Sequence, residues 1–285
     1  MTRSVQLIFK APYSTLEGDQ LDGTCYELMQ AGALGTAVET PPLLSCFVEP
    51  NESSIARILE CALLAGLTLQ ERREVTEENW SAGCPELWVP IQAGRLEVLP
   101  VESPDDRQVV GSNTLKIIPG LGFGTGHHPT TRMILTVLSQ LHADSLVTPT
   151  RVLDVGTGSG ILAIAANKLF GIDVDAIDID ASALDNARDN CILNGSREMV
   201  HLSTMPIEHL TSRYDLILGN LYGEVLVTMA PQIKRLAAPN CTILLSGITD
   251  LVRNIVVEEY TRDDLWYIVQ EYSEDSWVCL ILQAS

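Results

Sequence analysis

A glycine-rich turn stands between an expected strand and an expected helix. Residues 151–166 read RVLDVGTGSGILAIAA, so an apolar run of strand type leads through Gly156, Gly158 and Gly160 into a helical pattern. Glycine permits backbone with positive φ and lets a ligand come close to the main chain. The helix that follows presents unpaired N–H groups and the positive end of its dipole. We therefore expect this turn to bind a cofactor that carries an anionic group.

The spacing of the three glycines distinguishes two classes of cofactor. A dinucleotide fingerprint reads G-x-G-x-x-G or G-x-G-x-x-A, whereas the third glycine here comes one residue early and Ile161 takes the dinucleotide position. The pattern D-x-G-x-G-x-G from Asp154 is instead similar to the first motif of class I S-adenosylmethionine methyltransferases. Asp178, at the end of the next expected strand, offers two acceptor oxygens to ribose hydroxyls. The predicted cofactor is S-adenosylmethionine rather than a nicotinamide nucleotide.

A second glycine-rich stretch lies upstream, at residues 117–131, with the sequence IIPGLGFGTGHHPTT. Pro129 suits the first position of a helix, which puts Thr130 and Thr131 in its first turn. Hydroxyl and N–H groups at a helix N-terminus form a further polar site. The glycines before the helix suggest a loop that closes over bound cofactor, with Phe123 as its lid residue.

Two neighbouring histidines raise the question of a metal site. His127 and His128 cannot share one face of a helix, and no Glu or Cys stands at ligand spacing. We predict no metal site, and expect His128 to cap the helix and His127 to make a hydrogen bond in the loop. Seven scattered cysteines without a Cys-x-x-Cys pair indicate neither a zinc site nor a disulfide framework.

The strand pattern from Tyr214 ends in Asn220, at the carboxyl edge where open α/β sheets bind ligands. The Asn220 carbonyl could accept a hydrogen bond from an incoming amine and orient its lone pair, and a turn role is the alternative. Tyr222 is a candidate wall of the acceptor site that favours a cationic amine, with core packing as its alternative. Methyl transfer from a sulfonium depends on alignment and exclusion of water, so no nucleophilic triad is required. No general base is predicted.

The fold class predicted from the pattern of elements is α/β with two domains. Residues 1–75 have the order β-α-β-β-α-β, which suggests a small ferredoxin-like α+β domain, and Asn51 is expected to cap its second helix. Residues 76–110 read as a structured linker. Residues 111–285 alternate strands and helices and end in an antiparallel hairpin. This second part is predicted to be a Rossmann-like, seven-stranded methyltransferase domain.

Composition limits the partners. The 285 residues carry 18 basic and 37 acidic side chains, for a net charge of −19. Such a charge disfavours direct binding of nucleic acid and suits a basic partner, although acidity that only keeps the protein soluble is the alternative. No apolar run is long enough for a membrane span and the first residues lack a signal-peptide core, so a cytoplasmic location is expected. The sequence does not decide between a monomer and a dimer.

The motifs together resemble those of bacterial ribosomal protein L11 methyltransferases, which modify amino groups of a large-subunit ribosomal protein. Residues 123–131, FGTGHHPTT, are similar to the family's F-G-T-G-T-H-P-T-T, and residues 154–166 to its D-x-G-C-G-S-G-I-L-A-I-A-A. The resemblance implies that Thr131, Gly156, Asp178 and Asn220 contact the cofactor. It also implies an N-terminal domain that captures the basic substrate protein and a linker that swings it over the active site.

The chain departs from the family's pattern at His127, at Thr157 and in the stretch NLYGE from Asn220, where the family has Thr, Cys and N-I-L-A. These changes leave cofactor binding little affected and put the identity of the substrate in question. Methylation of lysines in another protein is the nearest alternative, followed by a small-molecule methyltransferase. A nicotinamide-dependent oxidoreductase and a cofactor-binding protein without catalysis rank last.

Overall fold

The computed structural model describes residues 3–12, 23–25, 27–28, 31–33, 35–38, 42–76, 88–119 and 124–284. The chain divides into two compact units, Met1–Pro85 and Glu86–Ser285. The candidate lid residue Phe123 lies outside the described residues. Among the described residues, no helix combines the length and the apolar character that a membrane crossing needs.

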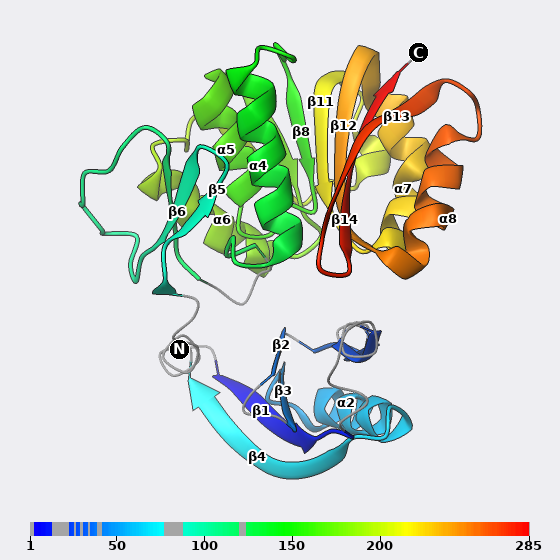
Figure 1. The fold of residues 1–285 in the computed structure, drawn as a ribbon. Coiled ribbons are helices and arrows are strands. Elements are labelled where there is room, and N and C mark those ends of the chain that lie inside the picture. The colour runs from blue at the N-terminus through cyan, green and yellow to red at the C-terminus, as the bar shows by residue number, and fades with distance from the viewer. Residues whose placement is uncertain are drawn as a thin grey trace. The chain divides into compact units, whose positions relative to one another are not determined.

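The first unit contains a four-stranded antiparallel sheet in the order β2-β3-β1-β4. Its elements are β1 (Arg3–Lys10), β2 (Gly35–Val38), β3 (Leu43–Val48), α2 (Glu52–Leu64) and β4 (Thr68–Thr76) (Figure 1). Residues 23–25 and 27–28 are helical, within the expected first helix. The predicted cap of α2 is confirmed, because the Asn51 side chain accepts a hydrogen bond from the Ser54 N–H at 2.8 Å.

The second unit is built on a seven-stranded sheet in the order β10-β9-β8-β11-β12-β14-β13. Its strands are β8 (Val152–Val155), β9 (Val174–Ile177), β10 (Val200–Ser203), β11 (Tyr214–Asn220), β12 (Ala237–Thr249), β13 (Trp266–Glu274) and β14 (Trp277–Ala284). The first five strands in this order are parallel, and β14 pairs antiparallel with both β12 and β13. The α/β prediction with a closing antiparallel hairpin is therefore confirmed.

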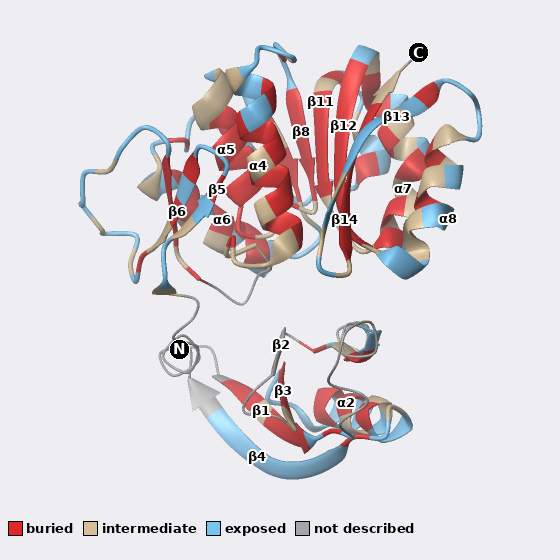
Figure 2. Cartoon of the chain, in the orientation of Figure 1, coloured by how far each residue is buried: buried red, intermediate tan, exposed pale blue. Residues whose placement is uncertain are grey.

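Helices cover both faces of this sheet (Figure 1). One face carries α4 (Pro129–Ala143), α5 (Ile161–Phe170) and α6 (Ala181–Leu193), and the other α7 (Gly223–Leu236) and α8 (Asp250–Thr261). In β11, Leu216 and Leu218 pack in the first core cluster and Ile217 in the second, since successive side chains point to opposite faces. Burial on both faces explains the nearly continuous apolar stretches of the inner strands β8, β11, β12 and β14, which are buried along most of their length (Figure 2).

A small three-stranded sheet precedes the large one, and two of its strands fall within residues 76–110, where the sequence predicts a linker. It consists of β5 (Ile91–Ala93), β6 (Leu96–Pro100) and β7 (Thr114–Ile117). Leu96, Val98 and Leu115 are buried in the same core cluster as α4 and α5, so the chain from Glu86 onward belongs to the second unit. Strands of three to five residues are too short to give a readable alternation of apolar and polar side chains.

Candidate functional site

The predicted site residues gather at the carboxyl edge of the large sheet. β8 and β11 are parallel neighbours, but α5 follows β8 on one face of the sheet and α7 follows β11 on the other. The strand order therefore reverses between these two strands. Ligands of open α/β sheets bind at such a switch point, because the two connections diverge there and leave room between them.

The turn after β8 requires glycine for both conformational and steric reasons. Gly156, Gly158 and Gly160 all have positive φ, at 69°, 54° and 81°. A Cβ atom on Gly156 would lie 2.4 Å from Cδ2 of Leu221, a distance that real Cβ atoms do not show. Gly160 is the N-cap of α5, and its N–H closes the turn on the carbonyl oxygen of Thr157 at 2.9 Å. The turn therefore brings main-chain atoms to the surface of the site without side chains in the way.

Asp178 lies against this turn, as the sequence predicts for a residue at the end of the next strand. Its Oδ2 accepts a hydrogen bond from the N–H of Gly158 at 2.9 Å, and its Oδ1 accepts one from the N–H of Asp180 at 3.0 Å. The main chain of the turn is also fixed to the same strand, because the N–H groups of Gly156 and Thr157 both donate to the carbonyl of Ile177. The half-buried carboxylate retains further acceptor capacity for a ligand.

Asp154 is a buried carboxyl beneath the turn. Its Oδ2 accepts hydrogen bonds from the Thr157 hydroxyl at 2.6 Å and from the Ala163 N–H at 3.1 Å, whereas its buried Oδ1 has no partner. Burial raises the pKa of Asp154 from 3.8 to about 7, against the two hydrogen bonds, which lower it. Asp154 enters the sequence argument only as the first letter of the motif, because its burial and its missing partner are visible only in the fold.

Thr131 and Asn220 meet across the site, although 89 residues separate them. The Asn220 Nδ2 donates to the Thr131 hydroxyl oxygen at 3.0 Å. Because this bond uses the amino side of the amide, the Oδ1 of Asn220 is left buried without a partner. A buried acceptor without a donor is costly, and such atoms occur where a ligand or water supplies the donor. The arrangement thus provides one oriented acceptor at the edge of the sheet.

Both histidines have the structural roles that the sequence predicts. The His128 Nδ1 accepts from the N–H of Thr130 at 3.3 Å and so caps α4. The His127 Nε2 lies 2.8 Å from the carbonyl oxygen of Val89. Burial lowers the pKa of His128 to about 4, so that its ring is neutral near pH 7 and able to accept. The part of the chain that the structure describes contains no group of three His, Cys, Asp or Glu side chains that could hold a metal ion.

Tyr222 is the residue immediately before α7, and its side chain is partly buried against the core cluster on the α4 and α5 face of the sheet. This contact corresponds to the core-packing alternative, and the role as wall of the acceptor site stays a prediction. Ile179, which stands between Asp178 and Asp180, is not among the residues predicted from the sequence, yet 93% of its surface is exposed beside the site. An apolar residue between two acids at a strand end is the sequence pattern that marks it.

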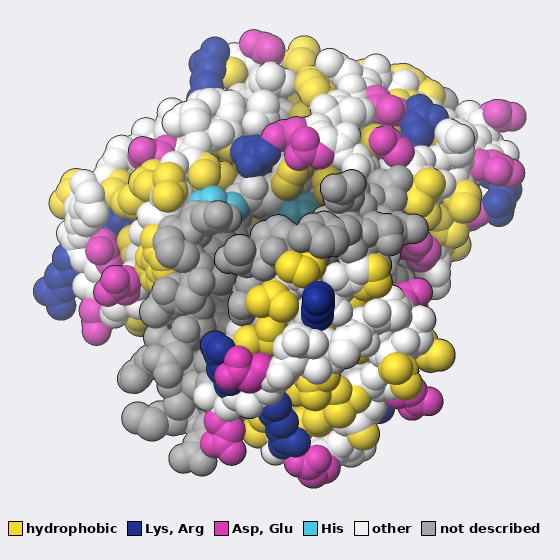
Figure 3. Space-filling view, turned by 60° about the horizontal axis from the view of Figure 1, so that its bottom comes forward, with side chains coloured by type: hydrophobic (Ala, Val, Ile, Leu, Met, Phe, Trp, Pro, Cys, Tyr) yellow, Lys and Arg dark blue, Asp and Glu magenta, His cyan; other side chains and the backbone are white. Residues whose placement is uncertain are grey.

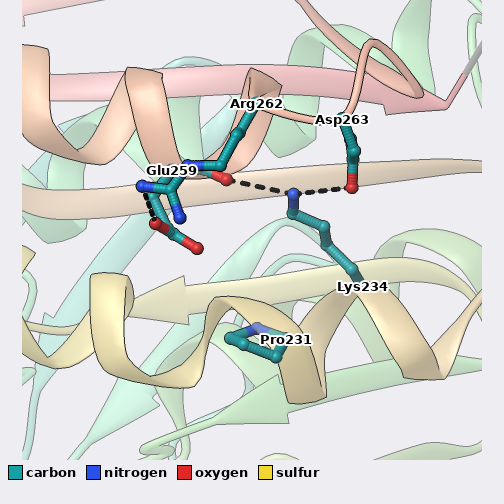
Figure 4. Close-up of a pocket in the computed structure, with 5 residues that line it drawn as sticks. All are labelled: Pro231, Lys234, Glu259, Arg262 and Asp263. Carbon is teal, nitrogen blue, oxygen red and sulfur yellow. Dashed lines mark hydrogen bonds and ion pairs between the residues drawn. The ribbon is translucent and has the colours of Figure 1, made fainter.

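A surface hollow elsewhere in the second unit does not qualify as the site. It lies at the C-terminal end of α7, whereas the predicted site lies at its N-terminal end. The Lys234 ammonium group in this hollow donates to the carbonyl oxygen of Glu259 and pairs with Asp263 at 3.0 Å (Figure 4). Pro231 and Arg262 complete the lining, and Arg262 pairs with Glu259. The two basic side chains in the hollow are both paired with acidic ones, so no charged group there is left to bind a ligand.

Comparisons with known proteins agree with the geometry of the switch point. The family model described as "Ribosomal protein L11 methyltransferase (PrmA)" matches residues 24–285. This chain belongs to that family. It is 36% identical over 218 residues to the ribosomal protein L11 methyltransferase of Geotalea uraniireducens, covering 72% of this chain and 68% of the relative. The corresponding protein of Geobacter sulfurreducens is 39% identical over 208 residues, covering 73% and 67%.

A solved structure supports the same assignment. The crystal structure of a ribosomal protein L11 methylase from Lactobacillus delbrueckii subsp. bulgaricus aligns with a TM-score of 0.59 and 29% identity, covering 69% of this chain and 98% of that chain. Family membership confirms the resemblance stated from the motifs and the prediction of S-adenosylmethionine as cofactor. The residues present fit that group, because the site combines a turn of three positive-φ glycines, in which a Cβ at Gly156 would collide with Leu221, with a buried acceptor on Asn220 that lacks a donor.

The position of Asp178 leads to a prediction with a matched control. Asp178→Ala removes the acceptor for the Gly158 N–H and for ribose hydroxyls, so affinity for S-adenosylhomocysteine should fall about tenfold or more. Asp180→Ala removes a carboxylate two residues away that only caps α6 through Ser182, and should leave the affinity within about twofold. Titration calorimetry measures both. Equal affinities of the two variants would contradict the assignment of Asp178.

The buried carboxyl of Asp154 leads to a prediction about stability and pH. Its pKa in the folded protein is higher than 3.8, so the folded state binds more protons than the unfolded chain between pH 3.8 and about 7. This contribution to stability is present at low pH and is lost as the pH rises toward 7. Asp154→Asn removes the titration, and the difference in unfolding free energy, wild type minus variant, should decrease across this window. Urea denaturation at several pH values tests it, and parallel pH profiles would reject the effect.

Proposed function

We propose that this chain is an S-adenosylmethionine-dependent protein methyltransferase that modifies lysine or other amino groups of the large-subunit ribosomal protein L11. Family membership supports the activity and the substrate. The observation that carries the chemistry is the unpaired, buried Oδ1 of Asn220, an oriented acceptor at the carboxyl end of β11. An amine that donates one N–H to this oxygen has its lone pair directed away from it, toward the interior of the site.

We assign different parts of the cofactor to different residues of the site. The N–H groups of Gly156, Thr157, Gly158 and Gly160 have partners within the protein, so the first turn of α5 is assigned to the anionic end of the cofactor. We assign its ribose hydroxyls to Asp178, and the exposed apolar side chain of Ile179 provides a surface for its ring. The unpaired oxygen of Asp154 suits a cationic amino group or the water that binds one.

When bound, S-adenosylmethionine supplies an electrophilic methyl group on a positively charged sulfur. Transfer to a neutral amine would form an N–C bond as the S–C bond breaks, with a neutral thioether as leaving group and a proton released from the resulting ammonium to water. Asn220 orients the amine, and Thr131 holds Asn220 by accepting its amino group. The amine must arrive without its proton, and desolvation next to a positive sulfur lowers its pKa in that direction. No side chain at the site is assigned as general base.

We assign substrate capture to the first unit and propose that it is a ferredoxin-like domain. The sheet order β2-β3-β1-β4 and the antiparallel pairing of β1 with both β3 and β4 support this fold. A net charge of −19 suits a basic ribosomal protein. On the face seen in Figure 3, acidic side chains are spread among basic and apolar ones. The cytoplasmic location stays a prediction.

The decisive experiment uses ribosomal protein L11 that lacks methyl groups. Incubation of the full chain with this protein and methyl-labelled S-adenosylmethionine should place label in L11, on lysine side chains or the terminal amine, as mass spectrometry of its peptides would show. Unlabelled L11 beside labelled lysine in another ribosomal protein would retain the enzyme class and reject the substrate. Absence of transfer to any protein, with small amines accepted instead, would favour the small-molecule alternative.

Loss of the contact between Asn220 and Thr131 is expected to slow the methyl-transfer step. Asn220→Ala removes the acceptor, and Thr131→Val removes the oxygen that holds the Asn220 amide. Both should lower kcat roughly 10- to 100-fold, because misplacement of a reacting group by about 1 Å has an effect of that size. Thr131→Ser keeps the hydroxyl and should retain most of the rate. Single-turnover methyl transfer at saturating cofactor measures the step, and an unimpaired Thr131→Val enzyme would argue against this arrangement.

A further inference from the structure

Three asparagines follow one another at every fourth position along α6 and its C-cap. Asn186, Asn190 and Asn194 therefore lie along one side of the helix. Each amide binds the main chain at the end of β7, either at Lys116 in the strand or at Ile118 directly after it. The side chains thus pair with this segment much as a neighbouring strand would, and none of these contacts belongs to the site residues predicted from the sequence.

Asn190 differs from the other two because it also binds the glycine turn. Its Oδ1 accepts from the N–H of Ile118 at 2.8 Å, and its Nδ2 donates to the carbonyl oxygen of Ser159 at 2.8 Å. The Asn190 side chain is completely buried, so neither bond can be replaced by bulk water. Asn194, by contrast, binds both the N–H and the carbonyl of Lys116, and its other hydrogen bonds join it to Lys168 and to the Asn190 carbonyl rather than to the turn.

The bond to Ser159 fixes the direction of a peptide group in the turn. In a trans peptide the C=O and the following N–H point in opposite directions. When Asn190 holds the Ser159 carbonyl toward α6, the N–H of Gly160 must therefore point the other way, where it binds the Thr157 carbonyl at 2.9 Å. That bond closes the turn around Gly158, whose N–H is the one that meets Asp178.

Two further contacts attach the same turn to its surroundings. A Cβ atom on Gly160 would lie 3.2 Å from the Cβ of Ala187, so α6 packs tightly against the turn one helical turn before Asn190. The buried Ser159 hydroxyl donates to the carbonyl of Gly124 at 2.6 Å. Ile118 and Gly124 stand on either side of residues 119–123 in the sequence, and both are bound to Ser159 or to its partner Asn190.

We infer that Asn190 is a positioning residue for cofactor binding, which acts by holding the Ser159–Gly160 peptide and thereby the shape of the glycine turn. It touches neither the cofactor nor the substrate amine. The inference rests on the proposed placement of S-adenosylmethionine at this turn. It adds that affinity for the cofactor depends on an amide in α6, on the far side of the turn from the ligand.

Asn190→Asp provides a sharp test, since it replaces the donor NH2 by an oxygen of nearly the same size. At about pH 8 the carboxylate faces the Ser159 carbonyl as a second acceptor, so affinity for S-adenosylhomocysteine should fall about tenfold relative to wild type. Burial raises the pKa of such a carboxyl, and its protonated form can donate to Ser159 while it accepts from Ile118. The ratio of variant to wild-type Kd should therefore approach one as the pH falls toward about 5.5.

Two other variants keep the test decisive. Asn194→Asp introduces the same change in the same row of asparagines without contact to the turn, and its Kd should stay within about twofold of wild type at each pH. Asn190→Ser removes the amide without adding a charge, and should lose affinity to a similar extent at every pH. Calorimetry gives the Kd values. Thermal unfolding gives the fraction of each variant that is folded, and each Kd is calculated for that folded fraction.

The outcomes separate this inference from the proposed function. If wild type binds S-adenosylhomocysteine and both Asn190 variants bind within about twofold of it at pH 8, the positioning role is rejected and the function stands. A loss of affinity in Asn194→Asp equal to that in Asn190→Asp would also reject it, because general weakening of the segment would then be the cause. If wild type itself does not bind, the cofactor site and this inference fail together.

Discussion

The close packing of the glycine turn against the Leu221 side chain constrains the architecture of this site. A Cβ atom at Gly156 would collide with that side chain, and all three glycines of the turn have positive φ. Glycine lowers the cost of this conformation, yet it adds flexibility that the surroundings must remove. The fold removes it with bonds from several directions, since Ile177, Asp178 and Asn190 all bind the turn through its N–H or C=O groups.

Most of the polar side chains at this edge of the sheet have hydrogen-bond partners within the protein. Asp178, Asn190 and Ser159 all have partners that fix their direction. Within the site, buried acceptors without partners remain on Asp154 and Asn220. Because an unpaired buried acceptor costs free energy, these two atoms identify where the folded chain still requires a donor from outside. Polar groups with partners thus stabilise the fold, and the acceptors without partners mark the candidate binding site.

Sequence patterns predict this fold well where the signal is local. The strands around Asp154 and Asp178, the start of α4 at Pro129 and the cap of α2 at Asn51 follow from short apolar runs and from capping chemistry. The contact of Thr131 with Asn220 follows less directly, because both lie at element ends that a parallel sheet brings to one edge.

Other parts of the site depend on contacts that no local pattern records. β5 and β6 are stabilised by burial against α4 rather than by their own periodicity. Asn190 reads as an ordinary polar residue of a helix, and only the packing of α6 against the turn shows that its amide is buried between two stretches of main chain. The exposure of Ile179 and the burial of Asp154 likewise depend on where the strands end in three dimensions.

The residues that depart from the family's motifs make contacts within the protein. Thr157 donates its hydroxyl to Asp154, and the His127 ring binds the carbonyl of Val89. Tyr222 packs against the core beside the start of α7. Each of these three residues makes a contact within the protein, while the glycines, Asp178, Thr131 and Asn220 keep the types that the motifs require. Discrimination between substrate proteins has to arise in groups that face the incoming amine and in the charge of the surface around them.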